Sequence, residues 1–142
     1  GGLTMERKIL TRLTREEIVP SEAYAFLASA EVGAISVFLG TTRRWTGQSE
    51  TTTLFYEAYE SMAESELQRL AMDIAGAFGL HAIIIIHRLG EVPLGEASVL
   101  FGVSASHRKE AFATVEEGMR RLKADIPIWK QDEDAQGSRQ WK

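Results

Sequence analysis

Cationic side chains form the first candidate site, at the start of the last long helix that the sequence predicts. His107 and Arg108 follow Ser106, whose hydroxyl can cap this helix. The free backbone amides of a first helical turn attract anions, whereas cations in that turn oppose the helix dipole unless an anion offsets them. The pattern is typical of either an anion-binding site or a turn exposed to solvent.

Two lysines form a second candidate site, near the other end of the same helix. Lys123 lies about 40° around the helix from Met119, beside the apolar stripe, and Lys130 follows the apolar segment 127–129. A single lysine in such a place can extend its amine to water. Two lysines near apolar surface repel each other, which favours an anionic ligand or one uncharged, nucleophilic amine.

The distance between these two sites is too large for one small ligand to contact both. Sixteen residues separate His107 from Lys123, about 24 Å of helix at 1.5 Å per residue. Both sites can serve one reaction if the helix start comes from a second subunit, or if the helix breaks at Gly118. We expect a homodimer with a shared site.

Other polar residues give weaker indications. Arg43 and Arg44 follow an apolar strand, and Glu57 could pair with one of the cations or lie at the rim of an interface. His81 and His87 would be about 20 Å apart on one strand and cannot share a metal ion. The sequence also lacks HExxH, paired-cysteine and glycine-rich phosphate motifs, so we expect neither a metal site nor a cofactor. We interpret His87 and its following arginine as a pair at a strand end.

The elements that must position these residues alternate between strands and helices, in the order β-α-β-β-α-β-β-α-β. Short loops join several strands, which predicts an α+β fold with a mainly antiparallel sheet and helices packed on it. Caps are expected at Thr14 or Ser21, at Ser61 in a capping box with Glu64, and at Ser106. Helices are expected to end near residues 30, 79 and 125, and the strands 33–39 and 81–89 are expected to be buried. The full set of expected strands is 8–12, 33–39, 51–59, 81–89, 97–104 and 128–130.

Length and composition fit one domain over residues 1–142, with 44% hydrophobic and 25% charged residues. The absence of cysteine excludes disulfides, thiolate metal sites and cysteine nucleophiles, and fits a cytoplasmic protein. A net charge of −4 argues against a nucleic-acid partner, and the longest apolar run, 82–86, is too short for a membrane span. We interpret residues 1–4, before Met5, as left by an expression vector, and residues 131–142 as a polar tail.

Five segments of the chain resemble the large, catalytic subunit of molybdopterin synthase. The resemblance covers roughly residues 33–130, and the combination of SxHR with LKxxxPxWK makes chance a poor explanation. The segments are GAISVFLGTTR (33–43), LFYEAYESMAE (54–64), HRLGEVPLGEASV (87–99), SASHRKEAF (104–112) and LKADIPIWK (122–130).

The resemblance implies an α/β hammerhead fold and a homodimer flanked by two small ubiquitin-like sulfur-carrier subunits, together a heterotetramer. Each carrier would insert a C-terminal Gly-Gly thiocarboxylate into the large subunit's pocket. The reaction that this implies transfers two sulfurs to cyclic pyranopterin monophosphate and forms the dithiolene of molybdopterin. Such a subunit needs no cofactor.

The same resemblance assigns roles to residues of this chain. Lys123 and Lys130 would be the catalytic lysines, which stabilise developing negative charge and transfer protons. His107 and Arg108 would hold the phosphate of the substrate. The full set of substrate-binding residues that it implies is Thr41, Thr42, Arg43, His107, Arg108, Gln131 and Asp132.

Two alternatives remain open on the sequence. The chain could be a non-catalytic module that docks a ubiquitin-like partner, in which case it should tolerate alanine at Lys123 and Lys130. Gly1 and Gly2 could also be the end of a carrier domain fused upstream rather than vector residues.

Overall fold

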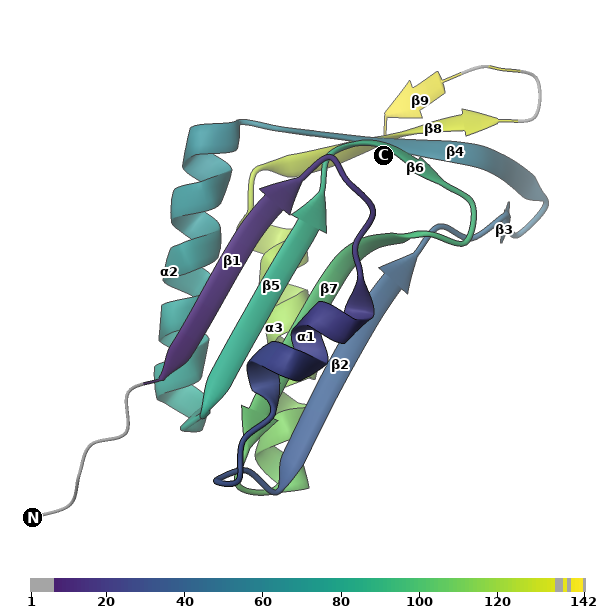
Figure 1. Cartoon of the computed structure of the whole chain (residues 1–142). Coiled ribbons are helices and arrows are strands. Elements are labelled where there is room, and N and C mark those ends of the chain that lie inside the picture. The colour runs from purple at the N-terminus through teal and green to yellow at the C-terminus, as the bar shows by residue number, and fades with distance from the viewer. Residues whose placement is uncertain (1–6, 135–136, 138, 142) are drawn as a thin grey trace, which may run out of the picture.

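The centre of the molecule is a four-stranded sheet in a computed structural model that describes residues 7–134, 137 and 139–141 (Figure 1). β1 and β5 run parallel, and the other neighbours are antiparallel. The prediction of a mixed α+β fold dominated by antiparallel pairing is therefore confirmed. In order across the sheet, the strands are β1 (Lys8–Thr14), β5 (Ala82–Arg88), β7 (Ala97–Ala105) and β2 (Ala34–Thr41).

Helices cover both faces of this sheet (Figure 1). α1 (Pro20–Leu27) packs on one face, whereas α2 (Glu60–Phe78) and α3 (Arg108–Asp125) pack on the other. The isoleucines of β5 alternate accordingly, because successive side chains of a strand point to opposite faces. Ile83 and Ile85 face α2 and α3, and Ile84 and Ile86 face α1. The expectation that this strand is buried is confirmed.

A second sheet, of five strands, crosses the end of the first (Figure 1). Its central strand, β4 (Ser49–Ala58), pairs antiparallel with three others. The sheet is completed by β3 (Trp45–Thr46), β6 (Gly90–Pro93), β8 (Ile128–Asp134) and β9 (Arg139–Trp141).

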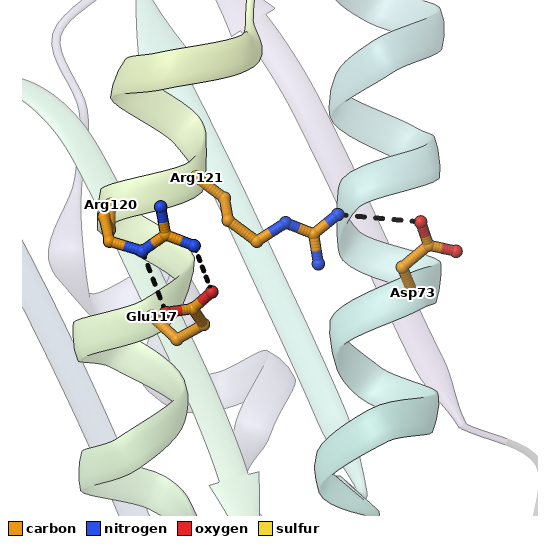
Figure 2. Close-up of polar contacts among 4 residues, drawn as sticks. All are labelled: Asp73, Glu117, Arg120 and Arg121. Atoms are coloured by element: carbon orange, nitrogen blue, oxygen red, sulfur yellow. Dashed lines mark hydrogen bonds and ion pairs between the residues drawn. The ribbon is translucent and has the colours of Figure 1, made fainter.

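Hydrogen bonds and ion pairs connect exposed side chains of α2 and α3 (Figure 2). Arg121 Nη2 of α3 reaches Asp73 Oδ2 of α2 at 3.7 Å, and Arg120 Nε contacts Glu117 Oε2 at 3.0 Å within α3. All four side chains are partly or largely exposed, so these contacts add little to the packing beneath them.

The expected helix caps were wrong. α1 begins at Pro20, whose fixed φ suits a first helical position, and Val19 is its N-cap. α2 begins at Glu60 directly after β4, and α3 begins after His107; neither N-cap side chain makes a capping hydrogen bond. A tertiary contact accompanies the start of α2: Tyr59, its N-cap, lies edge-on against Trp129 with ring centroids 5.0 Å apart.

Two strand predictions also need correction. The segment 33–39 was expected to be buried, but β2 is an edge strand whose Val37, Phe38 and Leu39 are 36–39% exposed. Apolar composition cannot distinguish a strand covered by its own chain from one left open at a sheet edge. The last extended segment is longer than 128–130: β8 continues to Asp134 and pairs with β9, so part of the expected polar tail is sheet. Residues 1–4 and Met5 lie outside the described residues.

Candidate functional site

A cavity of about 740 Å³ lies where the first sheet ends, between the last turns of α3 and the second sheet. Three cations line it: Arg43, which follows β2, Lys123 of α3, and Lys130 of β8. Apolar side chains from the same elements, among them Phe38 and Met119, complete much of the wall. The cavity thus combines positively charged side chains with apolar ones. The apolar surface lowers the local dielectric constant, which strengthens the attraction between these cations and an anionic group.

Lys123 owes its place to the end of α3. It lies in the last turn of the helix, where a cation interacts favourably with the helix dipole. The helix ends at Asp125 because the residue before Pro127 is disfavoured in helical conformation. The chain then enters β8 directly, which brings Lys130 to the same cavity.

The register of β4 and β8 decides which side chains of β8 share the cavity. Lys130 lies opposite Tyr56, and Asp132 opposite Leu54, and all four line the cavity. Because side chains alternate along a strand, Gln131 projects from the other face, away from Lys130. Glu57 of β4 lies one residue after Tyr56 and is likewise on that other face.

Of the three predicted residues that end or follow β2, two line the cavity and one does not. Thr41 and Arg43 line the cavity. Thr42 is buried in the wall behind it: its backbone N–H donates to Glu96 O at 3.1 Å, and its carbonyl accepts from the Gly95 N–H at 2.9 Å. Its hydroxyl has no hydrogen-bond partner among the described residues. Thr42 therefore shapes the rim that carries Arg43.

His107 and Arg108 lie at the start of α3, the opposite end of the helix from Lys123 and the cavity. The helix runs unbroken from Arg108 to Asp125, so a break at Gly118 does not bring the two ends together. The structure of one chain gathers Thr41, Arg43, Lys123, Lys130 and Asp132 around one cavity and leaves Thr42, His107, Arg108 and Gln131 outside it.

Sequence reasoning missed two further residues of the cavity wall, His87 and Tyr56. Their rings meet edge-on with centroids 4.9 Å apart. Burial lowers the pKa of His87 to about 4, and burial together with the charge of Asp132 raises the pKa of Tyr56 against the opposing effect of the Ser98 hydroxyl. Both side chains are therefore uncharged near neutral pH. The alternation of β4 marked the face that Tyr56 occupies, but no local pattern indicated that His87 ends beside it.

The described residues contain no group of three or more His, Asp or Glu side chains placed to hold a metal ion. None of the helices in this part of the chain is long and apolar enough to cross a membrane. The cavity offers three cations against one carboxylate, that of Asp132, together with hydroxyls and one imidazole, and this excess of positive charge suits an anionic organic ligand.

Comparison with known proteins shows the family to which the chain belongs. The model of the MoaE protein family matches residues 13–125. The chain belongs to the MoaE protein family. Two members similar to it are named molybdopterin synthase catalytic subunit: that of Bos taurus is 37% identical over 135 residues, covering 95% of this chain and 71% of the relative, and that of Bacillus subtilis is 41% identical over 102 residues, covering 72% and 65%.

Two solved structures share this fold. Molybdopterin synthase from Staphylococcus aureus superposes with a TM-score of 0.85 at 33% identity, covering 92% of this chain and 94% of the other. A complex of subunits 1 and 2 of molybdopterin-converting factor from Helicobacter pylori matches with a TM-score of 0.68 at 23% identity, covering 94% and 88%, a likeness in fold alone.

Proposed function

We propose that this chain is the sulfur-transferring subunit of a molybdopterin synthase. It would take one sulfur from the C-terminal thiocarboxylate of each of two small carrier proteins and add both to cyclic pyranopterin monophosphate. The products would be the molybdopterin dithiolene and two carriers that end in an ordinary carboxylate. The observation that carries the proposal is the meeting of Lys123, Lys130 and Arg43 around one cavity in a chain of the MoaE family.

The two lysines suit the charge changes of such a reaction. A thiocarboxylate is anionic, and negative charge develops on the substrate as sulfur adds and the cyclic phosphate opens. Ammonium groups held at a partly apolar wall stabilise that charge and can donate protons to it. Arg43 adds a guanidinium, which binds phosphate through two parallel N–H groups.

The carrier's C-terminal Gly-Gly would occupy part of the cavity. Glycines suit a narrow approach because they have no side chain to accommodate. The fold neighbour from Helicobacter pylori is a complex of two subunits, so a protein of this fold can hold a second subunit.

A homodimer would complete the site with His107 and Arg108. β2 exposes Val37, Phe38 and Leu39 at an open sheet edge, and a second copy is a natural cover for such an edge. His107 lies beside the start of β2, because the Gly33 N–H donates to Ala105 O at 3.0 Å, whereas Arg43 follows its end.

Pairing of two β2 strands about a two-fold axis would be antiparallel and self-complementary. The start of one strand would then lie beside the end of the other. An eight-residue strand spans about 26 Å, which matches the roughly 24 Å between His107 and Lys123 along α3. The partner's helix start would thus reach the cavity that its own chain cannot reach.

A single-turnover assay tests the proposal. The protein is mixed with a thiocarboxylated Gly-Gly carrier and cyclic pyranopterin monophosphate, and molybdopterin is measured by fluorescence after oxidation. We expect product from the wild-type protein and from Arg120→Ala, a matched control on the outer surface of α3 (Figure 2), and none from a folded Lys123→Ala protein. Carrier binding with no product from any of them would instead favour a docking module.

A further inference from the structure

His87 is a buried polar side chain in the cavity wall that none of the roles above uses. It follows Ile83 and Ile85 along the face of β5 that α2 and α3 cover, and lies where that face meets the cavity. The side chain is 5% exposed. A polar group so deeply buried is costly unless its hydrogen-bonding capacity is used.

The hydrogen bonds of His87 fix its tautomer. Nδ1 lies 2.9 Å from the carbonyl oxygen of Arg88, and a carbonyl can only accept, so Nδ1 carries the hydrogen. Nε2 then has a lone pair and no hydrogen. No described residue donates to Nε2, because Tyr56 contacts the imidazole through its ring and its hydroxyl interacts with Ser98.

The surroundings keep this imidazole uncharged. Burial lowers its pKa to about 4. The titratable groups that share the cavity with it are Arg43 after β2, Tyr56 from β4, Lys130 and Asp132 from β8, and Lys123 from α3. Arg88 points to the other face of the sheet, where its Nη1 lies 2.8 Å from Glu96 Oε1.

The Asp132 carboxylate and the hydroxyls of this wall can accept hydrogen bonds, whereas its lysine and arginine groups can only donate. His87 adds an uncharged acceptor, Nε2, that no described residue uses. The lysine and arginine donors suit phosphate and carbonyl oxygens. They cannot bind a ring N–H, and the lone pair of Nε2 would repel an anion. A pterin ring carries both carbonyl oxygen and N–H groups, so its recognition needs an acceptor as well as donors.

We propose that His87 is a substrate-binding residue whose Nε2 accepts a hydrogen bond from a ring N–H group of the pterin. This inference rests on the proposed function and extends it to the orientation of the substrate. With the ring held at His87, the remainder of the substrate faces the cationic part of the cavity.

Equilibrium binding of cyclic pyranopterin monophosphate, measured without carrier so that no turnover occurs, tests the role. His87→Phe keeps a ring against Tyr56 but has no acceptor, and we expect its Kd to rise about tenfold, the loss of one hydrogen bond. His87→Gln offers an amide oxygen and should recover much of the affinity. His81→Gln is the matched control, a histidine before the same strand that does not line the cavity.

Wild-type affinity in a folded His87→Phe protein would overturn the inference and leave the proposed function intact. Slower turnover at unchanged Kd would also overturn it, because His87 would then act on a lysine rather than on the substrate. A wild-type protein that binds carrier but no pterin would overturn the proposed function and the inference together.

A measurement on the wild-type protein covers the case in which His87→Phe does not fold. The chain has 3 histidines, so ¹⁵N-histidine labelling gives few signals. The two ring-nitrogen resonances of His87 are assigned by their absence from the spectrum of His87→Gln. We expect the unprotonated Nε2 resonance to move upfield when the pterin binds. An unchanged resonance at saturating pterin would contradict the hydrogen bond.

Discussion

Gly118 lies so close to the ring of Phe101 that a Cβ on Gly118 would stand 2.2 Å from Phe101 Cζ. The glycine thus lets α3 pack against β7 without interrupting the helix. Because the helix stays continuous, its two ends stay about 24 Å apart, and a site that uses both ends needs two chains.

Gly118→Ala should destabilise the protein by about 1–3 kcal/mol, because the added methyl group overpacks the core against Phe101. The higher helix propensity of alanine recovers at most about 1 kcal/mol. Gly76→Ala in α2 is the matched control, since a Cβ there meets nothing within 4 Å, and it should be neutral or stabilising. Urea unfolding of the three proteins measures both effects, and equal shifts in the two variants would contradict the packing argument.

Stability should depend on pH through His87. Its pKa is about 4 in the folded protein against 6.5 in the unfolded chain, so the unfolded state binds more protons between these values. The contribution is fully present above pH 6.5 and is lost as the pH falls toward 4, by up to about 3 kcal/mol. Unfolding free energies at pH 7 and 4.5 should therefore differ less in His87→Gln than in the wild-type protein. An identical pH dependence would mean that other groups cause it.

Two ion pairs with different burial should differ in their importance. The Arg88 side chain is 11% exposed and bonds Glu96, whose carbonyl also holds Thr42 behind the cavity rim. Arg88→Met leaves the Glu96 carboxylate without that partner and should cost about 1–3 kcal/mol. Arg121→Met removes the longer, more exposed contact with Asp73 and should cost less than about 1 kcal/mol. Thermal unfolding of both variants compares the two losses of stability. A larger loss in Arg121→Met than in Arg88→Met would contradict the prediction.

Much of the fold could be predicted from the sequence because its strands carry strong local patterns. The apolar residues of β5 and the stripe of α2 appear where expected. Helix starts could not be predicted, because capping serines compete with tertiary contacts such as that between Tyr59 and Trp129. The exposure of β2 could not be predicted either, since composition does not reveal whether a neighbour covers a strand.

The candidate site likewise contains residues that could be predicted from the sequence and residues that could not. Lys123 and Lys130 stood out because each combines a charge with apolar neighbours, and both line the cavity. Gln131 was included through its neighbour in sequence, but the alternation of β8 turns it to the other face. His87 was missed because its place in the cavity wall depends on contacts with β4, a strand distant in sequence.

Val37→Lys should convert the protein to monomers if β2 forms the dimer interface. Val37 is 39% exposed on the open edge and does not line the cavity, so the substitution spares the pocket of its own chain. Two lysines that face each other across a two-fold axis repel, and a lysine at a strand edge blocks pairing. Sedimentation velocity should show half the wild-type mass, with sulfur transfer strongly reduced. A dimeric Val37→Lys protein would direct the search for the interface to another surface.

Mixed dimers decide whether the site is shared between chains. In a dimer of Lys123→Ala with Arg108→Ala, one of the two shared sites would contain both defects and the other neither. Random assortment should therefore restore about a quarter of wild-type activity to two inactive proteins. Lys123→Ala mixed with Arg43→Ala is the control, because both residues line the cavity of one chain and every mixed site keeps one defect. If the first mixture recovers no more activity than the control, although mixed dimers are verified by mass, then His107 and Arg108 act outside this site.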